Sequence, residues 1–197
     1  MSEPSGKRIT VALTGATGAG FGVAVVRRLA ANAAVAQVTV LLTPTGRRCL
    51  LDECGLRLEE LLAVSPKLRH VDERNLGADI SSGSHPQDGM AIVPCSAGTL
   101  GRIAAGVSEA LVTRAADVCL KERRPLVLCL RETPLNRIHL ENMLRVHDAG
   151  AVVMPLMPGF YHHPQTLDDL FAAFATRVLD QLGLPEPDPR RWGGVQP

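Results

Sequence analysis

The sequence lacks the features expected of a membrane or nucleic-acid-binding protein. No apolar run approaches the ~20 residues that a helix needs to cross a bilayer, and the first eight residues lack the apolar stretch of a signal peptide. Opposite charges almost cancel, since 21 Lys and Arg stand against 20 Asp and Glu. We therefore expect a cytoplasmic protein that partners neither membranes nor nucleic acids, in which local groups must meet any phosphate.

Cysteine and histidine are too few and too scattered to indicate disulfides or a metal site. The five cysteines have no C-x-x-C spacing and are odd in number, so reduced thiols are expected. Two of the six histidines, His162 and His163, are adjacent, but no H-E-x-x-H motif or Cys/His cluster accompanies them. We expect no bound metal.

Strands and helices alternate along most of the chain. Apolar runs predict strands at 9–13, 38–42, 90–93, 126–130 and 151–154. Helical spacing predicts helices at 19–31, around 49–51, and at 97–105, 108–122, 136–147 and 167–182. Repeated strand–helix units predict an α/β fold, a Rossmann-like three-layer sandwich with a mostly parallel sheet.

The length of 197 residues suits a single domain. We expect one α/β domain to span 9–184, with an irregular N-terminus at 1–8 and an irregular, Pro-rich tail at 185–197. The periodic pattern weakens at 55–89, which predicts a loop-rich insertion with one short helical piece near 59–62. Ligands of such sheets bind beyond the carboxyl ends of the strands.

A glycine-rich turn, 14–22, follows the first strand. Glycines there let backbone N–H groups approach a phosphate at a helix N-terminus, although a tight turn without a ligand gives the same pattern. The turn partly resembles that of extended short-chain dehydrogenases, with Phe21 at the last glycine position. Those enzymes need a Tyr followed four residues later by a Lys. The only tyrosine, Tyr161, is followed at that spacing by Gln165, which excludes that chemistry.

A second turn rich in small and hydroxyl residues, 94–100, enters the next helix. Two such turns indicate one phosphorylated ligand. Helix capping by Ser96 and Thr99 would give the same pattern. For Cys95, a small apolar filler is favoured over a nucleophile, because no His and acid pair accompanies it in the sequence.

Charged residues gather around the strand at 126–130. Arg131 and Glu132 follow it directly, where they suit either an anion clamp beside an acid–base carboxylate or a surface ion pair. Lys121, Arg123 and Arg124 stand at the C-terminus of the preceding helix, where cations ordinarily complement the helix dipole.

Together these segments resemble the UbiX family of flavin prenyltransferases over nearly the whole chain. The block from R-A-A-D to R-E-T-P is the most specific part, and the glycine turn is the least. The matching motifs are T-G-A-T-G-A at Thr14, S-S-G-S at Ser81, P-C-S-x-G-T-L at Pro94, R-A-A-D-V-x-L-K-E-R-R-P-L-V-L at Arg114, R-E-T-P-L at Arg131, H-L-E-N-M-L at His139, P-x-x-P-G-F-Y-H-x-P-Q at Pro155 and R-W-G at Arg191.

The resemblance implies a metal-independent enzyme that joins a dimethylallyl group from dimethylallyl phosphate to N5 and C6 of reduced FMN. It implies that the prenylated FMN serves UbiD-type decarboxylases. It also implies a large homo-oligomer, a dodecamer, with sites at subunit boundaries.

The resemblance also assigns site residues by position. Those implied to bind FMN are Gly15, Ala16, Thr17, Thr43, Ser96, Ala97, Gly98, Thr99 and Arg131. Those implied to bind the prenyl donor are Tyr161, Arg177, Arg114 and Lys121. Those implied to be catalytic are Glu132, Lys121, Arg131 and Glu53. Cleavage of an allylic C–O bond leaves charge on the phosphate, which Lys, Arg and Tyr donors stabilise, while carboxylates handle the proton at N5.

Two other functions stay open. An FMN-dependent cysteine decarboxylase would use flavin as an oxidant, but it needs an active-site His and a substrate-clamping signature that cannot be placed in this sequence. A non-catalytic FMN carrier subunit of a decarboxylase is poorly separated by sequence. It would return FMN unchanged from an incubation with the prenyl donor.

Overall fold

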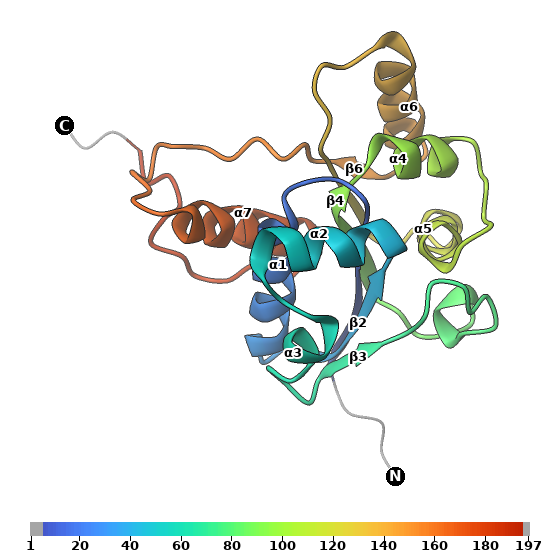
Figure 1. Ribbon diagram of the computed structural model, residues 1–197, viewed down its shortest axis with the longest axis horizontal. Coiled ribbons are helices and arrows are strands. Elements are labelled where there is room, and N and C mark those ends of the chain that lie inside the picture. The colour runs from blue at the N-terminus through green and yellow to red at the C-terminus, as the bar shows by residue number, and fades with distance from the viewer. Residues whose placement is uncertain (1–5, 195–197) are drawn as a thin grey trace.

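A parallel sheet lies between two layers of helices in the computed structural model, which describes residues 6–194 (Figure 1). Each strand is followed by a helical or irregular crossover, as the alternating pattern predicts. The elements are β1 (Lys7–Leu13), α1 (Ala19–Ala31), β2 (Val35–Leu42), α2 (Pro44–Cys54), α3 (Leu58–Leu62), β3 (Leu68–His70), the 3₁₀ helix η1 (Asp79–Ser81), β4 (Gly89–Cys95), α4 (Ala97–Ala104), α5 (Leu111–Lys121), β5 (Leu126–Leu130), α6 (Arg137–Asp148), β6 (Val152–Val153) and α7 (Leu167–Gln181).

The strand order β3-β2-β1-β4-β5-β6 places a topological switch point between β1 and β4. The chain moves outward from β1 to β3, then crosses back to start β4 on the other side of β1. All five strand pairings are parallel, so the carboxyl ends share one edge of the sheet. Leu13 pairs with Leu42, which brings the turns after β1 and β2 together.

Two apolar cores cover the two faces of the sheet. One contains buried side chains from α1, α2, α3 and α7, and the other contains buried side chains from α4, α5 and α6. The strands at the centre alternate between these cores: Val11 and Leu13 lie in the first and Ala12 in the second. Central strands buried on both faces read as continuous apolar runs, which is why the sequence pattern identifies them.

The α/β prediction is confirmed, and the structure corrects its details. β1 begins at Lys7 rather than Ile9, β2 begins at Val35 rather than Val38, and α5 begins at Leu111 rather than Ser108. The region predicted as a loop-rich insertion also contains β3, at the edge of the sheet. Three residues are too short to display a strand period, so the pattern does not reveal it.

The tail after α7 has no helix or strand among its described residues, yet a buried carboxylate holds it in place. The Asp188 side chain is only 1% exposed and lies 3.2 Å from Arg28 Nη2 on α1 and 2.7 Å from Arg190 Nη2. It also accepts a hydrogen bond from the Thr176 hydroxyl on α7. The tail is therefore a packed part of the domain. Residues 1–5 and 195–197 of the predicted irregular ends lie outside the described residues.

Acid is expected to release this tail. Burial opposes ionisation of Asp188, but hydrogen bonds from Arg190 and Thr176 outweigh it and hold the pKa of Asp188 well below its ordinary value. A depressed pKa gives stability that is complete above the unfolded-state pKa of about 3.9 and is lost as pH falls below it. Fluorescence of Trp192, the single tryptophan, should therefore stay constant down to about pH 4 and change below it.

The Asp188→Asn variant is the control, because it has no proton to gain at this position and should show a smaller acid transition, the remainder coming from Asp180, which holds Arg191 next to Trp192. Far-UV circular dichroism should show that helices persist when the Trp192 signal first changes. A transition of the same size in Asp188→Asn would contradict the assignment to this carboxylate.

Candidate active site

The turns after β1 and β4 are tied together at the switch point by one hydroxyl. Thr14 Oγ1 donates to the Pro94 carbonyl at 2.9 Å and accepts from the Ser96 amide at 2.8 Å. Thr14 is 1% exposed, so these bonds are shielded from water and fix the spacing of the two turns. The two turns predicted to meet one ligand thus form a single wall.

A cavity of about 400 Å³ opens beside this wall. Four predicted FMN-binding residues line it: Gly15, Thr43, Ser96 and Thr99. Thr43 caps α2 by accepting from the Gly46 amide at 3.0 Å, and Ser96 caps α4 by accepting from the Thr99 amide at 3.3 Å. The capping interpretation is therefore confirmed for Ser96, while Thr99 supplies the capped amide. The two caps place two helix N-termini, which favour anions, on one cavity.

Glycine is required at position 15 by a close approach. A Cβ there would lie 2.6 Å from Thr45 Cβ on α2. The turn can therefore pass this close to α2 only without a side chain. Ala16 beside it is 5% exposed, whereas Gly15 and Thr17 are exposed and can be reached by a ligand.

Glu53 occupies the N-terminus of α1. Its Oε2 accepts from the Gly18 amide at 2.8 Å and the Ala19 amide at 2.9 Å. These are the amides that the glycine-rich turn could offer to a phosphate, and in this structure the Glu53 carboxylate accepts from them. The same bonds hold a carboxylate next to the Gly15–Thr17 turn, which is the place expected for Glu53 near a flavin.

Arg131 and Glu132 follow β5 on the same edge of the sheet. The Arg131 amide donates to the Cys95 carbonyl at 3.0 Å, which sets this loop beside the Ser96 turn. Burial, Glu53 and Asp52 raise the pKa of Cys49 on α2, and the nearby Arg131 charge opposes this rise. Arg131 Nε is buried and has no hydrogen-bond partner within residues 6–194. A buried cationic donor without a partner is costly, and an FMN oxygen would satisfy it, so these residues fit the cofactor.

Glu132 forms no ion pair with Arg131 within the described chain. Glu132 Oε1 instead accepts from the Thr133 amide at 3.0 Å. The interpretation of Arg131 and Glu132 as a surface ion pair is therefore not supported. The backbone bond orients the carboxylate on its loop, as a proton-transferring group requires.

Lys121 and Arg114 lie on α5 next to the S-S-G-S loop. Arg114 Nε donates to the Ser81 carbonyl at 3.0 Å, and Arg114 also pairs with Asp117 at 2.8 Å. Lys121 pairs with Glu122. Gly83 lies against this pair, because a Cβ there would be 2.5 Å from Lys121 Nζ. The two predicted cations share one helix and one loop.

Tyr161 and Arg177 lie elsewhere in the chain. The segment between β6 and α7 runs away from the sheet toward the side of α7, whereas α5 lies on the other side of the sheet (Figure 1). There Tyr161 lines a cavity of about 310 Å³ with Arg191 and Trp192. Tyr161 does not line the cavity that Gly15 and Ser96 line.

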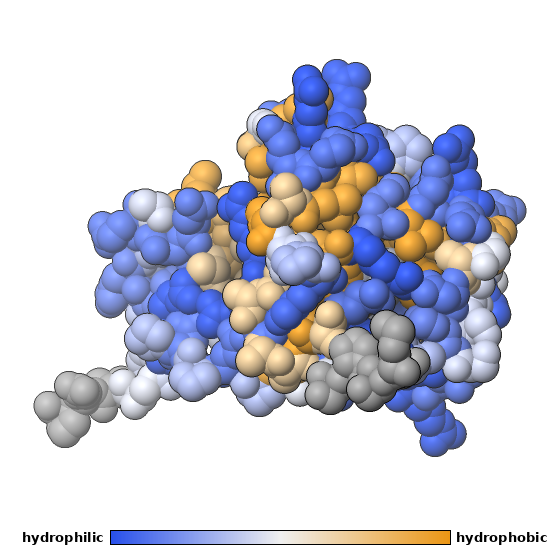
Figure 2. Space-filling view, turned by 90° about the horizontal axis from the view of Figure 1, so that it is seen from below, coloured by the Kyte–Doolittle hydropathy of each residue, from blue (hydrophilic) through white to orange (hydrophobic). Residues whose placement is uncertain are grey.

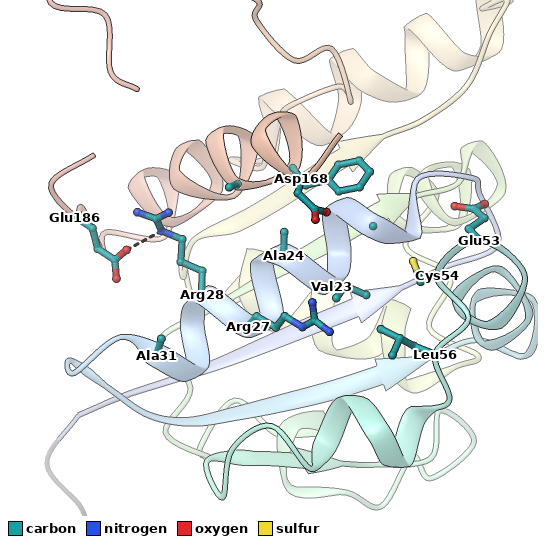
Figure 3. Close-up of a pocket in the computed structure, with 13 residues that line it drawn as sticks. Val23, Ala24, Arg27, Arg28, Ala31, Glu53, Cys54, Leu56, Asp168 and Glu186 are labelled. Atoms are coloured by element: carbon teal, nitrogen blue, oxygen red, sulfur yellow. Dashed lines mark hydrogen bonds and ion pairs between the residues drawn. The ribbon is translucent and has the colours of Figure 1, made fainter. Parts of the chain in front are cut away.

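A larger cavity, of about 730 Å³, lies between α1, the end of α2 and α7 (Figure 3). Val23 and Ala24 line it from α1, and Arg28 on its rim pairs with Glu186 of the tail at 2.8 Å. Glu53 lies at its edge. It is away from the two hydroxyl-capped helix N-termini, and Glu53 is the one predicted site residue that lines it.

The cysteines offer no activated thiol. Burial raises the pKa of Cys95 and of Cys119 to about 12, so the filler interpretation of Cys95 stands. All five cysteines are free. Within residues 6–194 no three His, Cys, Asp or Glu side chains are grouped to hold a metal ion, and no helix is long and apolar enough to cross a membrane.

The sequence did not identify several residues of the smaller cavity, which Gly15 and Ser96 line. Glu73, Arg102, Glu109 and Thr113 also line it. Burial and Asp72 raise the pKa of Glu73, while Arg74 and Arg102 lower it. Glu73 lies in the region predicted as a loop, where no pattern marks a wall residue. Phe21, which breaks the dehydrogenase turn, packs edge-on against Phe171 and Phe174 of α7 and has a structural role.

Comparison with known proteins also identifies this chain as a flavoprotein. The family model described as Flavoprotein matches residues 1–176. A probable UbiX-like flavin prenyltransferase of Streptomyces sp. (strain D7) is 47% identical over 96% of this chain and 93% of its own. The flavin prenyltransferase UbiX of Salmonella typhimurium is 45% identical over 96% of this chain and 100% of its own. The chain belongs to the UbiX flavin prenyltransferase family of flavoproteins.

Solved structures agree with this membership. The crystal structure of AnUbiX with FMN and dimethylallyl pyrophosphate has a TM-score of 0.85 and 39% identity, covering 97% of this chain and 100% of that one. A dodecameric FMN-dependent UbiX-like decarboxylase from Escherichia coli O157:H7 has a TM-score of 0.88 and 42% identity, covering 95% and 100%. The FMN-dependent cysteine decarboxylase TvaF, at 17% identity and a TM-score of 0.62 over 90% and 98%, shares the fold alone.

Proposed function

We propose that this protein transfers a dimethylallyl group from dimethylallyl phosphate to reduced FMN, forming bonds to N5 and C6. The observation that carries the proposal is the buried, unpartnered Arg131 Nε beside the hydroxyl-capped cavity. That cavity lies at the switch point where α/β sheets bind nucleotides. Relatives that are 45% and 47% identical over nearly the full chain support this chemistry.

The chain's own residues supply binding, charge and proton handling. Thr43, Ser96 and Thr99 would hold the FMN chain, and Arg131 would hold a flavin oxygen beside them. FMN supplies the two ring atoms that become alkylated. Glu132 would accept the proton that leaves N5 when the first bond forms and return it to the prenyl alkene, and the C6 proton would leave when the second bond forms, because the Glu132 carboxylate is held on the loop next to Arg131. No metal is needed where cationic side chains stabilise the departing phosphate.

The cationic groups divide between two surfaces of the chain, so we propose that each site is shared between subunits. Tyr161 and Arg177 of one copy would face the flavin cavity of another. α6 projects from the body (Figure 1) and exposes Ile138, Leu140 and Leu144 by 65%, 52% and 60%. Apolar surface also lies between hydrophilic patches on the face seen in Figure 2. Such surfaces mark association sites, and the dodecameric relative supports a dodecamer here.

We also propose that a UbiD-type decarboxylase receives the product. Prenylated FMN is a modified cofactor rather than an end product, so a second enzyme must consume it. The cysteine-decarboxylase alternative loses support, because the TvaF likeness extends only to the fold.

The direct test mixes the protein with reduced FMN and dimethylallyl phosphate without air. The flavin spectrum should change, and the flavin mass should rise by one dimethylallyl group in place of one hydrogen. A heat-inactivated sample is the control for spontaneous alkylation. Recovery of unchanged FMN would instead indicate a carrier.

A further inference from the structure

One carboxylate on α7 is shared by two arginines. Asp180 Oδ2 accepts from Arg177 Nη1 at 2.9 Å, and the two Asp180 oxygens accept from Arg191 Nη1 and Nη2 at 2.8 Å and 2.6 Å. The Asp180 side chain is 13% exposed. We call these three residues the Asp180 triad. Two guanidiniums and one carboxylate leave the triad with one net positive charge.

Arg191 is anchored independently of the triad. Its Nη2 also donates to the Glu186 carbonyl at 2.9 Å, and Glu186 is itself paired with Arg28 of α1. The fork geometry of the Arg191–Asp180 contact is the bidentate one that fixes a carboxylate most firmly. Asp180 is therefore held from the tail side, and Arg177 makes a single bond to Oδ2, an oxygen that Arg191 also contacts.

The same arginine connects the triad to Tyr161. Arg191, Tyr161 and Trp192 line one cavity of about 310 Å³, together with His162. The Tyr161 and Trp192 rings are 5.7 Å apart in an edge contact, and Tyr161 is 49% exposed. His162 Nε2 is buried and finds no hydrogen-bond partner within residues 6–194. The cavity thus combines an unsatisfied polar atom with a half-exposed phenol.

We propose that Arg191 is a positioning residue for the donor's phosphate. It acts through Tyr161 and Arg177, which we call the phosphate grip, and this inference rests on the proposed function. By neutralising Asp180 from the tail side, Arg191 leaves the charge of Arg177 available to the phosphate. Without Arg191, the mostly buried Asp180 would have Arg177 as its remaining triad partner, and the pair would carry no net charge. A neutral pair attracts a phosphate dianion less than a cationic triad does.

The test compares Arg191→Gln with wild type in the full-length, assembled protein. The KM for dimethylallyl phosphate should rise about tenfold while kcat changes little, because the lost interaction holds the donor in ground state and transition state alike. FMN affinity should not change, since the flavin cavity is built from other elements. Arg191→Lys keeps the positive charge but cannot make the bidentate contact with Asp180. Its KM should therefore fall between those of wild type and Arg191→Gln.

Lys7→Gln is the matched control. This substitution breaks a partly exposed ion pair with Asp88, at 3.6 Å. The pair lies at the amino-terminal end of β1, away from the Asp180 triad, so the KM for dimethylallyl phosphate should stay unchanged. A KM at the wild-type value in Arg191→Gln, or an Arg191→Lys variant as impaired as Arg191→Gln, would overturn the inference. Equal losses of donor and FMN binding would also overturn it, because Arg191 would then not act on the donor's phosphate alone.

A second readout needs no turnover and separates this inference from the proposed function. Inorganic phosphate titrated into the wild-type protein should alter Trp192 fluorescence, and Arg191→Gln should need about tenfold more phosphate for the same change. Absence of prenylated flavin with wild type would refute the proposed function alone. Equal phosphate titrations of wild type and Arg191→Gln would refute the role of Arg191.

Discussion

Glu132→Gln is expected to bind FMN normally while prenyl transfer slows by about 10²- to 10⁴-fold, the range of general acid–base catalysis. Glutamine keeps the oxygen that accepts from the Thr133 amide, so the loop geometry is retained. It loses the ability to take a proton from N5. Single-turnover kinetics without air, started by adding dimethylallyl phosphate to the protein with reduced FMN, measure the rate.

Glu59→Gln is a suitable control for this variant. Glu59 lies on α3 with its side chain 75% exposed and 3.9 Å from Arg47, and its change should alter neither FMN binding nor the rate. Since the control loses the same charge, a slow Glu132→Gln cannot be attributed to charge alone. Full activity of Glu132→Gln would remove Glu132 from the mechanism.

Two inactive variants are expected to restore activity when they are assembled together. Arg177→Gln damages the phosphate grip and Glu132→Gln damages the flavin side of the site. If the two sides come from different chains, random mixing in a symmetric oligomer gives about a quarter of the sites both intact sides. Co-expressed variants should then show about a quarter of the wild-type rate, well above either variant alone.

The control for complementation places both substitutions on one chain and mixes that chain with wild type. A site built within one chain would retain activity in proportion to the wild-type chains, about half, whereas a shared site would retain about a quarter. Co-expressed single variants that stay as inactive as each alone would contradict a shared site. Size-exclusion chromatography with light scattering would verify that the mixed assemblies form.

The sequence predicts the fold and the meeting of the two small-residue turns well, because both depend on local patterns. Buried strands read as apolar runs, and the residue after each strand then falls at one edge of the sheet. Thr43 and Ser96 cap their helices as their positions suggest. These features need no knowledge of long-range contacts.

The rest depends on tertiary contacts that no local pattern encodes. Glu53 takes the α1 N-terminus although it is more than 30 residues away in the chain, so the glycine turn alone suggested a phosphate there. The tail reads as irregular because its order comes from the buried Asp188 rather than from helix or strand. Sequence order likewise could not reveal that Tyr161 lies apart from the flavin cavity.

In the assembly we propose, Tyr161 and Arg177 of one subunit face the flavin bound by another. The most direct measurement is an experimental structure of the assembled protein with FMN and dimethylallyl phosphate. We expect the phosphate to be bound by Tyr161 and Arg177 of one copy. It should lie beside a flavin held by Ser96 and Arg131 of a second copy. A phosphate gripped far from any flavin, or in a site where Tyr161 takes no part, would contradict it.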